Sequence, residues 1–205
     1  FGISRTGTAP SPVTAIKCDL ADDAAIQSAF ENLSRAGERI DILVNAAGIT
    51  VGSPFESFAL EDWKRVVDTN LVGSMMMSQL FVRQKGAQDS SIVNVTSVVG
   101  RVAALAQSPY VASKWALEGV SEGLAQELAP FGIRVVIVEP GITKSAIFAK
   151  SVDFPHVTAA YEAPYQRMFQ MYATGIPVAT DPFEVAEVIH RAATTDEPQL
   201  RYVTS

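Results

Sequence analysis

Short apolar runs alternate with longer amphipathic segments along the chain. The short runs, rich in Ile and Val, occupy residues 1–4, 13–18, 40–44, 92–95, 133–138 and 201–203, and we predict a strand at each. The longer segments carry apolar residues at helical spacing and occupy residues 22–36, 60–67, 70–83, 110–129 and 182–193. In the first of these segments, Ala25, Ile26, Ala29, Phe30 and Leu33 would share one helix face.

This alternation is typical of one fold class. Strands that alternate with helices favour a parallel sheet with helices on both faces, joined by right-handed crossovers. The run at 40–44 is continuously apolar, as expected of a strand that is covered on both faces. We therefore predict an α/β protein with a doubly wound parallel sheet in three layers, α/β/α. Residues 1–205 would form a single domain.

Composition and charge exclude several classes of protein. Hydrophobic residues make up 48% of the chain and charged residues 19%, which excludes a disordered chain. The net charge is −6 without a cluster of Lys or Arg, so we expect no nucleic acid partner. One Cys and two His supply neither a disulfide nor a metal site, and a cytoplasmic setting is expected. No apolar run approaches the ~20 residues that a transmembrane helix needs.

The strongest candidate for chemistry is a tyrosine and a lysine four residues apart, Tyr110 and Lys114. Ser108 and Pro109 precede them as the cap and first position of a predicted helix, so both side chains would lie on one helix face. A phenol that exchanges protons near neutral pH needs a pKa about 3 units below its usual value, and a nearby ammonium favours the phenolate. The same two residues also fit an amphipathic helix with a core tyrosine and a surface lysine.

Polar residues follow several predicted strands. Ser97 follows the run at 92–95, the segment Asn45-Ala46-Ala47-Gly48 follows the run at 40–44, and Pro140-Gly141 follows the run at 133–138. Asn70 begins a predicted helix. Because ligand sites of open α/β sheets lie beyond the carboxyl ends of the strands, we expect these residues to face one site.

With these motifs in this order, the sequence resembles the short-chain dehydrogenase/reductase family over about residues 1–195. Tyr110 and Lys114 match the Tyr-x-x-x-Lys signature of the family, and Ser97 and Asn70 match the other two members of its catalytic tetrad. The segment 45–48 matches the Asn-Asn-Ala-Gly motif, with Ala46 in the second place. In its later part the chain is also similar to members that act on steroids and retinoids.

The resemblance implies a Rossmann-type fold and an enzyme, namely an NAD(P)(H)-dependent oxidoreductase. It would transfer hydride between nicotinamide and a ketone, an aldehyde or a secondary alcohol. Tyr110 would exchange a proton with the substrate oxygen, and Lys114 would lower the tyrosine pKa and hold the nicotinamide ribose. Ser97 would orient the substrate, and Asn70 would position a water. The alternative is a non-catalytic dinucleotide-binding or sensor protein of the same family, which would not need the complete tetrad.

Family motifs also imply the contacts to the cofactor. They lie mostly after predicted strands and are Arg5, Asp19, Leu20, Asn45, Ala46, Ala47, Gly48, Tyr110, Lys114, Pro140, Gly141, Thr143 and Ser145. Ser145 stands where the family has a threonine, and Thr143 is an alternative hydroxyl. Arg5 ends the first predicted strand where an acidic residue would bind the ribose of NAD. A guanidinium suits a 2′-phosphate, so we expect NADP(H) to be preferred over NAD(H).

The glycine-rich phosphate loop of the family has no counterpart in this sequence. No Gly-x-Gly occurs in the 205 residues. We therefore align residues 1–5 with the second strand of the family. The first strand and helix, about 30 residues in such a unit, are expected upstream, which would make the domain N-terminally incomplete.

We expect the segment at about 143–180 to form the substrate lid, because six aromatic residues fall between positions 148 and 172. Tyr161, Tyr165, Met168 and Tyr172 would share one helix face, which would either line a pocket or pack on the core or a partner. The substrate would be a bulky, lipophilic carbonyl compound or alcohol. The residues expected to contact it are Ser97, Tyr110, Phe148, Tyr165 and Phe169.

The resemblance also implies self-association. The two long helices predicted at 70–83 and 110–129 would pair in a homodimer or homotetramer. Leu117, Val120 and Leu124 would face either the sheet or a partner subunit, and the sequence leaves both possibilities open.

Overall fold

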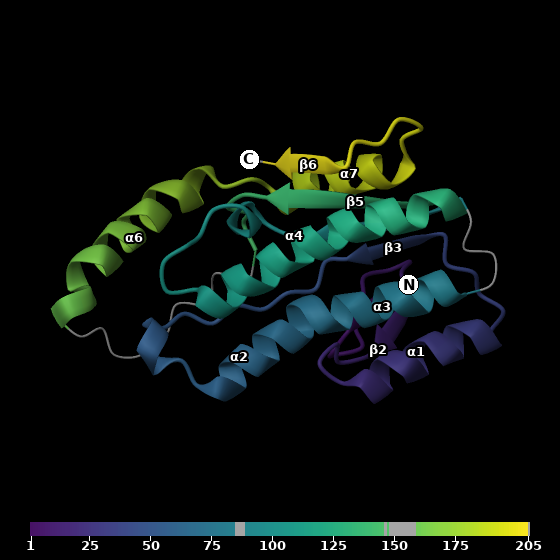
Figure 1. Ribbon diagram of the computed structural model, residues 1–205, viewed down its shortest axis with the longest axis horizontal. Coiled ribbons are helices and arrows are strands. Elements are labelled where there is room, and N and C mark those ends of the chain that lie inside the picture. Colours follow the sequence, from purple (N-terminus) through teal and green to yellow (C-terminus); the bar gives the residue numbers. More distant parts are fainter. Residues whose placement is uncertain (85–88, 146, 148–158, 205) are drawn as a thin grey trace.

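The structure, a computed structural model, describes residues 1–84, 89–145, 147 and 159–204 (Figure 1). Its strands are β1 (Gly2–Ser4), β2 (Ala15–Lys17), β3 (Ile42–Asn45), β4 (Ser90–Val95), β5 (Ile133–Pro140) and β6 (Arg201–Thr204). Its helices are α1 (Asp23–Arg35), α2 (Leu60–Val67), α3 (Gly73–Arg83), α4 (Ser108–Leu128), α6 (Glu162–Gly175) and α7 (Pro182–Thr194). The predicted alternation of strands and helices is therefore confirmed.

All strand pairs in the described part of the chain are parallel, as predicted, but they form two sheets. One sheet has the order β3-β4-β5-β6, and the other contains β1 and β2. No described strand joins β1 to β3 by a ladder of hydrogen bonds. Ile42 and Val44 on one face of β3 are correspondingly exposed.

Helices cover the larger sheet on both sides, which confirms the α/β/α layers. The helices α1, α3 and α4 lie side by side on one face, whereas α7 lies behind the sheet (Figure 1). On the first side α3 packs on β3 and α4 on β5, and on the other side α7 packs on β4, β5 and β6.

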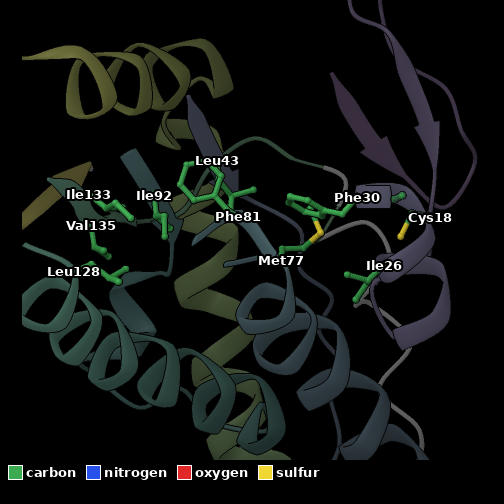
Figure 2. Close-up of a cluster of buried hydrophobic side chains, with 11 residues drawn as sticks. Cys18, Ile26, Phe30, Leu43, Met77, Phe81, Ile92, Leu128, Ile133 and Val135 are labelled. Atoms are coloured by element: carbon green, nitrogen blue, oxygen red, sulfur yellow. The ribbon is translucent and has the colours of Figure 1, made fainter. Parts of the chain in front are cut away.

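The larger hydrophobic core lies under α1, α3 and α4 (Figure 2). Ile26 of α1, Phe81 of α3 and Ile92 of β4 are completely buried there, so the predicted apolar face of α1 is confirmed. The next residue of β4, Val93, points to the opposite side and packs with Ala192 of α7. Burial on alternate sides explains why these strands read as continuous apolar runs.

The segment expected to form a lid begins and ends at one place. Thr143 forms a parallel bridge with Thr180, the Lys144 amide donates to the Thr180 carbonyl at 3.0 Å, and the Thr180 amide donates to the Ile142 carbonyl at 2.9 Å. Between these positions, α6 buries part of its apolar face. The described part of the segment is therefore anchored beside the end of β5.

The helices α2 and α3, predicted with a break between them, are joined by a π-helical turn over Asp68–Val72. Such turns occur frequently at functional sites. Gly73, the first residue of α3, lies directly against the backbone of Leu20. A Cβ atom at Gly73 would be 2.3 Å from the Leu20 carbonyl oxygen, which is too short for any contact. The absence of a side chain at Gly73 thus permits the loop after β2 to pack on this junction.

We predict that Gly73→Ala destabilises the protein by about 1–3 kcal/mol, because the new methyl group would overpack this contact. Alanine elsewhere in a helix stabilises by about 0.5–1 kcal/mol relative to glycine. Gly119→Ala in α4 is the matched control, since its Cβ would meet nothing within 4 Å. Urea unfolding of both variants measures the free energies. Equal stabilisation by both substitutions would contradict the packing argument.

Candidate active site

A cavity of about 830 Å³ lies beyond the carboxyl ends of β3, β4 and β5. Its volume is in the range of small-molecule and cofactor sites. The described residues that line it are Arg5, Ala46, Gly48, Ile49, Thr50, Arg65, Val95, Thr96, Ser97, Val98, Val99, Ala104, Gln107, Tyr110, Lys114, Pro140, Gly141, Ile142, Thr143, Ser145, Ile147, Met171, Tyr172, Val185 and Ile189. The predicted edge of the sheet therefore carries a cavity.

Asn70 joins the loop after β3 to α4 from inside the π-helical turn. Its Oδ1 accepts from the Ile49 amide at 2.8 Å, and its Nδ2 donates to the Ile49 carbonyl at 2.9 Å and to Ser113 Oγ at 3.1 Å. Asn70 is completely buried. A Cβ atom at Gly48 would lie 3.7 Å from Lys114 Nζ and 3.8 Å from Asn70 Oδ1, so these groups converge behind the cavity wall.

Lys114 is buried although it carries an ammonium group, with 3% of its surface exposed. Its Nζ donates to the Val95 carbonyl at 2.8 Å and lies 5.8 Å from the centre of the Tyr110 ring. Burial lowers the pKa of Lys114 to about 8, and the charge of Glu118 opposes this shift. The lysine therefore remains mostly charged at neutral pH, in a place where the charge is costly.

The Tyr110 phenol is half-buried and hydrogen-bonded to Ser97. Burial raises its pKa above the usual value, the hydrogen bond with Ser97 opposes this, and the Tyr172 phenol raises the pKa further. The net shift is upward because burial is its largest cause, and the Lys114 ammonium lies against the ring and donates to Val95. At neutral pH the tyrosine carries its proton.

The Ser97 hydroxyl lies at the end of β4, between Tyr110 and the end of β5. Its Oγ donates to the Pro140 carbonyl at 3.3 Å and accepts from the Val99 amide at 3.3 Å. The serine is half-buried and lines the cavity. A ligand oxygen beside Tyr110 would compete with Pro140 for the single hydroxyl proton.

Most of the other expected cofactor residues also reach the cavity. Ala46 and Gly48 line it from β3, as do Pro140, Gly141, Thr143 and Ser145 after β5. Arg5 lines the same cavity from the end of β1, although β1 belongs to the other sheet. Arg5 is exposed and forms no ion pair within the described residues.

Two other residues of the Asn-Asn-Ala-Gly-like segment do not reach the cavity. The Asn45 amide points into the interior, where its Nδ2 donates to Asn94 Oδ1 at 2.9 Å and Ser78 Oγ at 3.0 Å. These contacts join β3, β4 and α3. Ala47 does not line the cavity. Asn45 therefore has a structural position, because strand geometry turns alternate residues to opposite sides.

Asp19 and Leu20 also lie away from the main cavity. Asp19 is exposed, and its carboxylate accepts from the Ala21 amide at 3.1 Å. Leu20 packs on Gly73 and borders a separate, smaller hollow. The turn after β2 thus places Leu20 at the junction of α2 and α3, whereas Asp19 lines neither hollow.

The expected substrate residues in the lid segment are only partly where we predicted them. Tyr165 is buried against Ala106 and Met168, so the predicted apolar stripe packs on the core there. Phe169 is 42% exposed, and neither Tyr165 nor Phe169 lines the cavity. Phe148 lies outside the described residues.

Several cavity residues were missed. Gln107 is buried at the cap position of α4, where Ser108 was expected, and its side chain is hydrogen-bonded to Tyr172. The helix itself begins at Ser108. Arg65, Thr50 and Met171 also line the cavity. Tyr172 was on the predicted apolar face, whereas Gln107 and Arg65 lay in no pattern that indicated a site.

Two properties of the described residues concern a membrane and a metal ion as partners. No described helix has both the length and the apolar character needed to span a bilayer. Within the same residues, no group of three or more His, Cys, Asp or Glu side chains is placed to hold a metal ion.

Comparisons with known proteins agree with this geometry. A family model described as short chain dehydrogenase matches residues 3–155. The uncharacterized oxidoreductase YusZ of Bacillus subtilis (strain 168) is 35% identical over 192 residues, which are 90% of this chain and 68% of that protein. The 17-beta-hydroxysteroid dehydrogenase type 1 of Homo sapiens is 32% identical over 203 residues, which are 96% of this chain and 61% of that protein.

Solved structures are similar as well. A short-chain dehydrogenase from Streptomyces avermitilis has a TM-score of 0.81 at 34% identity, over 96% of this chain and 72% of that one. A short chain dehydrogenase from Burkholderia cenocepacia J2315 in complex with NADP has a TM-score of 0.73 at 29% identity, over 92% of this chain and 74% of that one. A 4-hydroxyisoleucine dehydrogenase complexed with NADH and succinate has a TM-score of 0.62 at 34% identity, over 64% of this chain and 62% of that one.

We predict that the buried Lys114 makes stability depend on pH. A lysine whose pKa is about 8 when folded and near 10.5 when unfolded binds fewer protons in the folded protein between these values. The free energy of unfolding should therefore rise by about 2 kcal/mol between pH 7 and pH 9.5 relative to that of Lys114→Met. Urea unfolding of both proteins at the two pH values tests this. A difference between the two proteins that stays constant with pH would contradict the shift.

Proposed function

The chain belongs to the short-chain dehydrogenase family, and from this premise we propose that it is an NAD(P)(H)-dependent oxidoreductase that interconverts a lipophilic carbonyl compound and its alcohol. The observation that carries the proposal is the convergence of Ser97, Tyr110 and buried Lys114 on one wall of the cavity. A bound nicotinamide dinucleotide would supply the hydride donor or acceptor.

The residues around Lys114 fit the nicotinamide ribose. An ammonium has three donors, and the hydrogen bond to Val95 uses one of them, which leaves two for ribose hydroxyls. Thr50 Oγ1 is buried at the cavity without a hydrogen-bond partner in the described part of the chain, as expected of a group that serves a ligand. Thr143 and Ser145 offer further hydroxyls on the side of β5.

In the direction of reduction, the protonated Tyr110 would give its proton to the substrate oxygen. Its raised pKa keeps the proton on the phenol at neutral pH, so the donor form is ready. Ser97 would give its hydrogen bond to the same oxygen in place of Pro140. Lys114 would stabilise the phenolate that remains, because opposite charges attract strongly in a buried site. Asn70 would hold the loop and α4 in register through Ile49 and Ser113, and its expected contact with a water stays a prediction.

The walls of the cavity support a lipophilic substrate. Beside Tyr110 they are formed by Val99, Ala104, Ile142, Ile147 and Met171. These apolar side chains bind by excluding water from a ligand of similar character. One similar protein is a 17-beta-hydroxysteroid dehydrogenase. Because Met171 and Tyr172 of α6 belong to this wall, we assign the segment at 143–180 the role of lid.

Two features support association of two or more copies of the chain. Trp115 on α4 is 50% exposed, and Val120 on the same helix is exposed as well. Leu117 is completely buried, so it faces the sheet side and leaves the other face of α4 to a partner. A homodimer or homotetramer would cover this apolar surface.

The cofactor preference is tested at Arg5. Similar proteins bind NADP in one case and NADH in another. The Arg5 guanidinium lines the cavity, forms no ion pair with the residues that the structure describes, and favours the 2′-phosphate. We predict that Arg5→Ala weakens NADPH binding by about 10- to 100-fold, the value of one charge-assisted pair, and leaves NADH binding unchanged. Titration calorimetry with both nucleotides measures this. An equal effect on both nucleotides would contradict a 2′-phosphate site.

The acid–base role is tested at Tyr110. We predict that Tyr110→Phe lowers kcat for reduction of a lipophilic ketone by about 10²- to 10⁴-fold, because the proton donor is lost, while NADPH still binds. Consumption of NADPH measures turnover, and calorimetry measures binding. Tyr202→Phe is the control, since Tyr202 lies on β6 outside the cavity.

Two results would decide against this function. If Tyr110→Phe kept the rate of the unaltered protein, the tyrosine would not be the proton donor. If the unaltered protein bound NADPH tightly and reduced or oxidised no substrate in a panel of lipophilic ketones and alcohols, the alternative of a dinucleotide sensor would replace the enzyme.

A further inference from the structure

A buried ionic cluster lies beneath the catalytic wall, and the chemistry described above makes no use of it. It consists of Glu118 on α4, Glu139 on β5 and Arg201 on β6. The two glutamates are 6% and 2% exposed. Arg201 Nε lies 3.1 Å from Glu118 Oε2 and 3.1 Å from Glu139 Oε1, so one guanidinium bridges both carboxylates.

The cluster contacts the site through Thr96. The Thr96 hydroxyl donates to Glu118 Oε1 at 2.5 Å. On one side of Thr96, the Val95 carbonyl accepts from Lys114 Nζ, and on the other side is Ser97. The position of Thr96 therefore sets two contacts of the catalytic wall at once.

Glu139, at the other end of the cluster, is also connected to the site, through the residue that follows it. Glu139 directly precedes Pro140, whose carbonyl accepts from the Ser97 hydroxyl. The turn after Ser97 also closes on the same part of α4, because a Cβ atom at Gly100 would lie 3.0 Å from Glu118 Cγ. The Glu118 side chain is thus confined by packing as well as by hydrogen bonds.

The cluster and the surface groups that flank it contain more carboxylates than guanidinium groups. With Arg101 and Glu122 counted, the carboxylates of Glu118, Glu139 and Glu122 face two guanidinium groups, which leaves one excess negative charge. Glu118 lies one helical turn from Lys114. Two surface groups flank the cluster, Arg101 against Glu139 and Glu122 against Arg201. Burying a carboxylate costs several kcal/mol, so stability alone is a poor reason for Glu118 to be there.

We propose that Glu118 is a positioning residue of this active site, which holds Thr96 and thereby the Val95 carbonyl and Ser97, and which sets a buried negative charge one helical turn from Lys114. This inference rests on the proposed function for its consequence in catalysis. The electrostatic link itself is a property of the chain alone. The charge of Glu118 raises the pKa of Lys114, which is the direction that the proposal requires.

The decisive variant is Glu118→Gln, which keeps the size of the side chain and an acceptor for Thr96 but removes the charge. The matched control is Glu122→Gln, because Glu122 is on the same helix and also pairs with Arg201, but is half-exposed and has no contact with Thr96. NMR titration of protein labelled at its lysine side chains gives the pKa of Lys114 in each protein. The Lys114 signal is assigned with Lys114→Met.

In Glu118→Gln we expect the pKa of Lys114 to fall, since the buried carboxylate one helical turn away has lost its charge. The alkaline limb of the kcat profile should move to lower pH by the same amount. Glu122→Gln should leave both values in place. A Lys114 pKa that is the same in Glu118→Gln, Glu122→Gln and the unaltered protein would overturn the proposal.

A second variant tests the hydrogen bond without altering any charge. Thr96→Val keeps the shape of the side chain and removes the hydroxyl that Glu118 holds. We expect kcat to fall on the order of tenfold through misplacement of the site, with an unchanged KM for the nucleotide. An unchanged kcat would overturn the positioning role of Thr96. If the unaltered protein has no reductase activity, the proposed function fails, and the NMR titration still decides the electrostatic role of Glu118.

Discussion

The burial of one ammonium group is the constraint on which the rest of the site depends. Lys114 belongs to α4, and its ammonium group reaches the end of β4 with almost no exposure. Burial alone would favour the neutral form of this group. The structure offsets this with a carbonyl acceptor from Val95, the face of the Tyr110 ring and a carboxylate one turn away at Glu118. Each of these groups comes from the end of a strand or from α4. A rearrangement of any of them would leave the charge uncompensated, so the lysine and its surroundings form one unit.

Parallel pairing brings these groups to one edge. The ladder pairs Asn45 of β3 with Asn94 of β4, and Val95 of β4 with Val138 of β5, so the three strands end nearly level. The loops that follow them therefore open into the same cavity. The sheet of β1 and β2 is separate, yet Arg5 reaches this cavity too. The fold thus lines one cavity with an exposed cation, Arg5, and a buried cation, Lys114, and both suit an anionic ligand that carries hydroxyl groups.

Sequence patterns predicted the helix faces and the ends of the strands, which depend on periodicity. They missed burial and pKa shifts, which depend on the surroundings of each side chain. The i, i+4 spacing of Tyr110 and Lys114, and the rule that sites follow the ends of strands, were sufficient to assemble the catalytic wall. Helical periodicity grouped Tyr165 with Tyr172, but it could not tell which of them packs on the core and which lines the cavity. Burial is the largest cause of the raised Tyr110 pKa, and the burial of a side chain cannot be read from a sequence. The expected lowering of this pKa by Lys114 stays a prediction. In the sequence, a buried glutamate such as Glu118 cannot be distinguished from an exposed glutamate of an amphipathic helix.

The lowered pKa of Lys114 and the raised pKa of Tyr110 bear on the direction of the proposed reaction. At neutral pH the site holds a charged Lys114 and a protonated Tyr110, which is the state that can donate a proton. If the phenol gives its proton to a substrate oxygen, the phenolate belongs to a ring whose centre lies 5.8 Å from the ammonium nitrogen. The new pair of opposite charges would then offset the cost of burying each. The uncompensated charge is therefore greatest before the transfer and smallest after it. This asymmetry is a reason to propose reduction of a carbonyl, whereas the cation at Arg5 would suit the 2′-phosphate of either redox form of NADP.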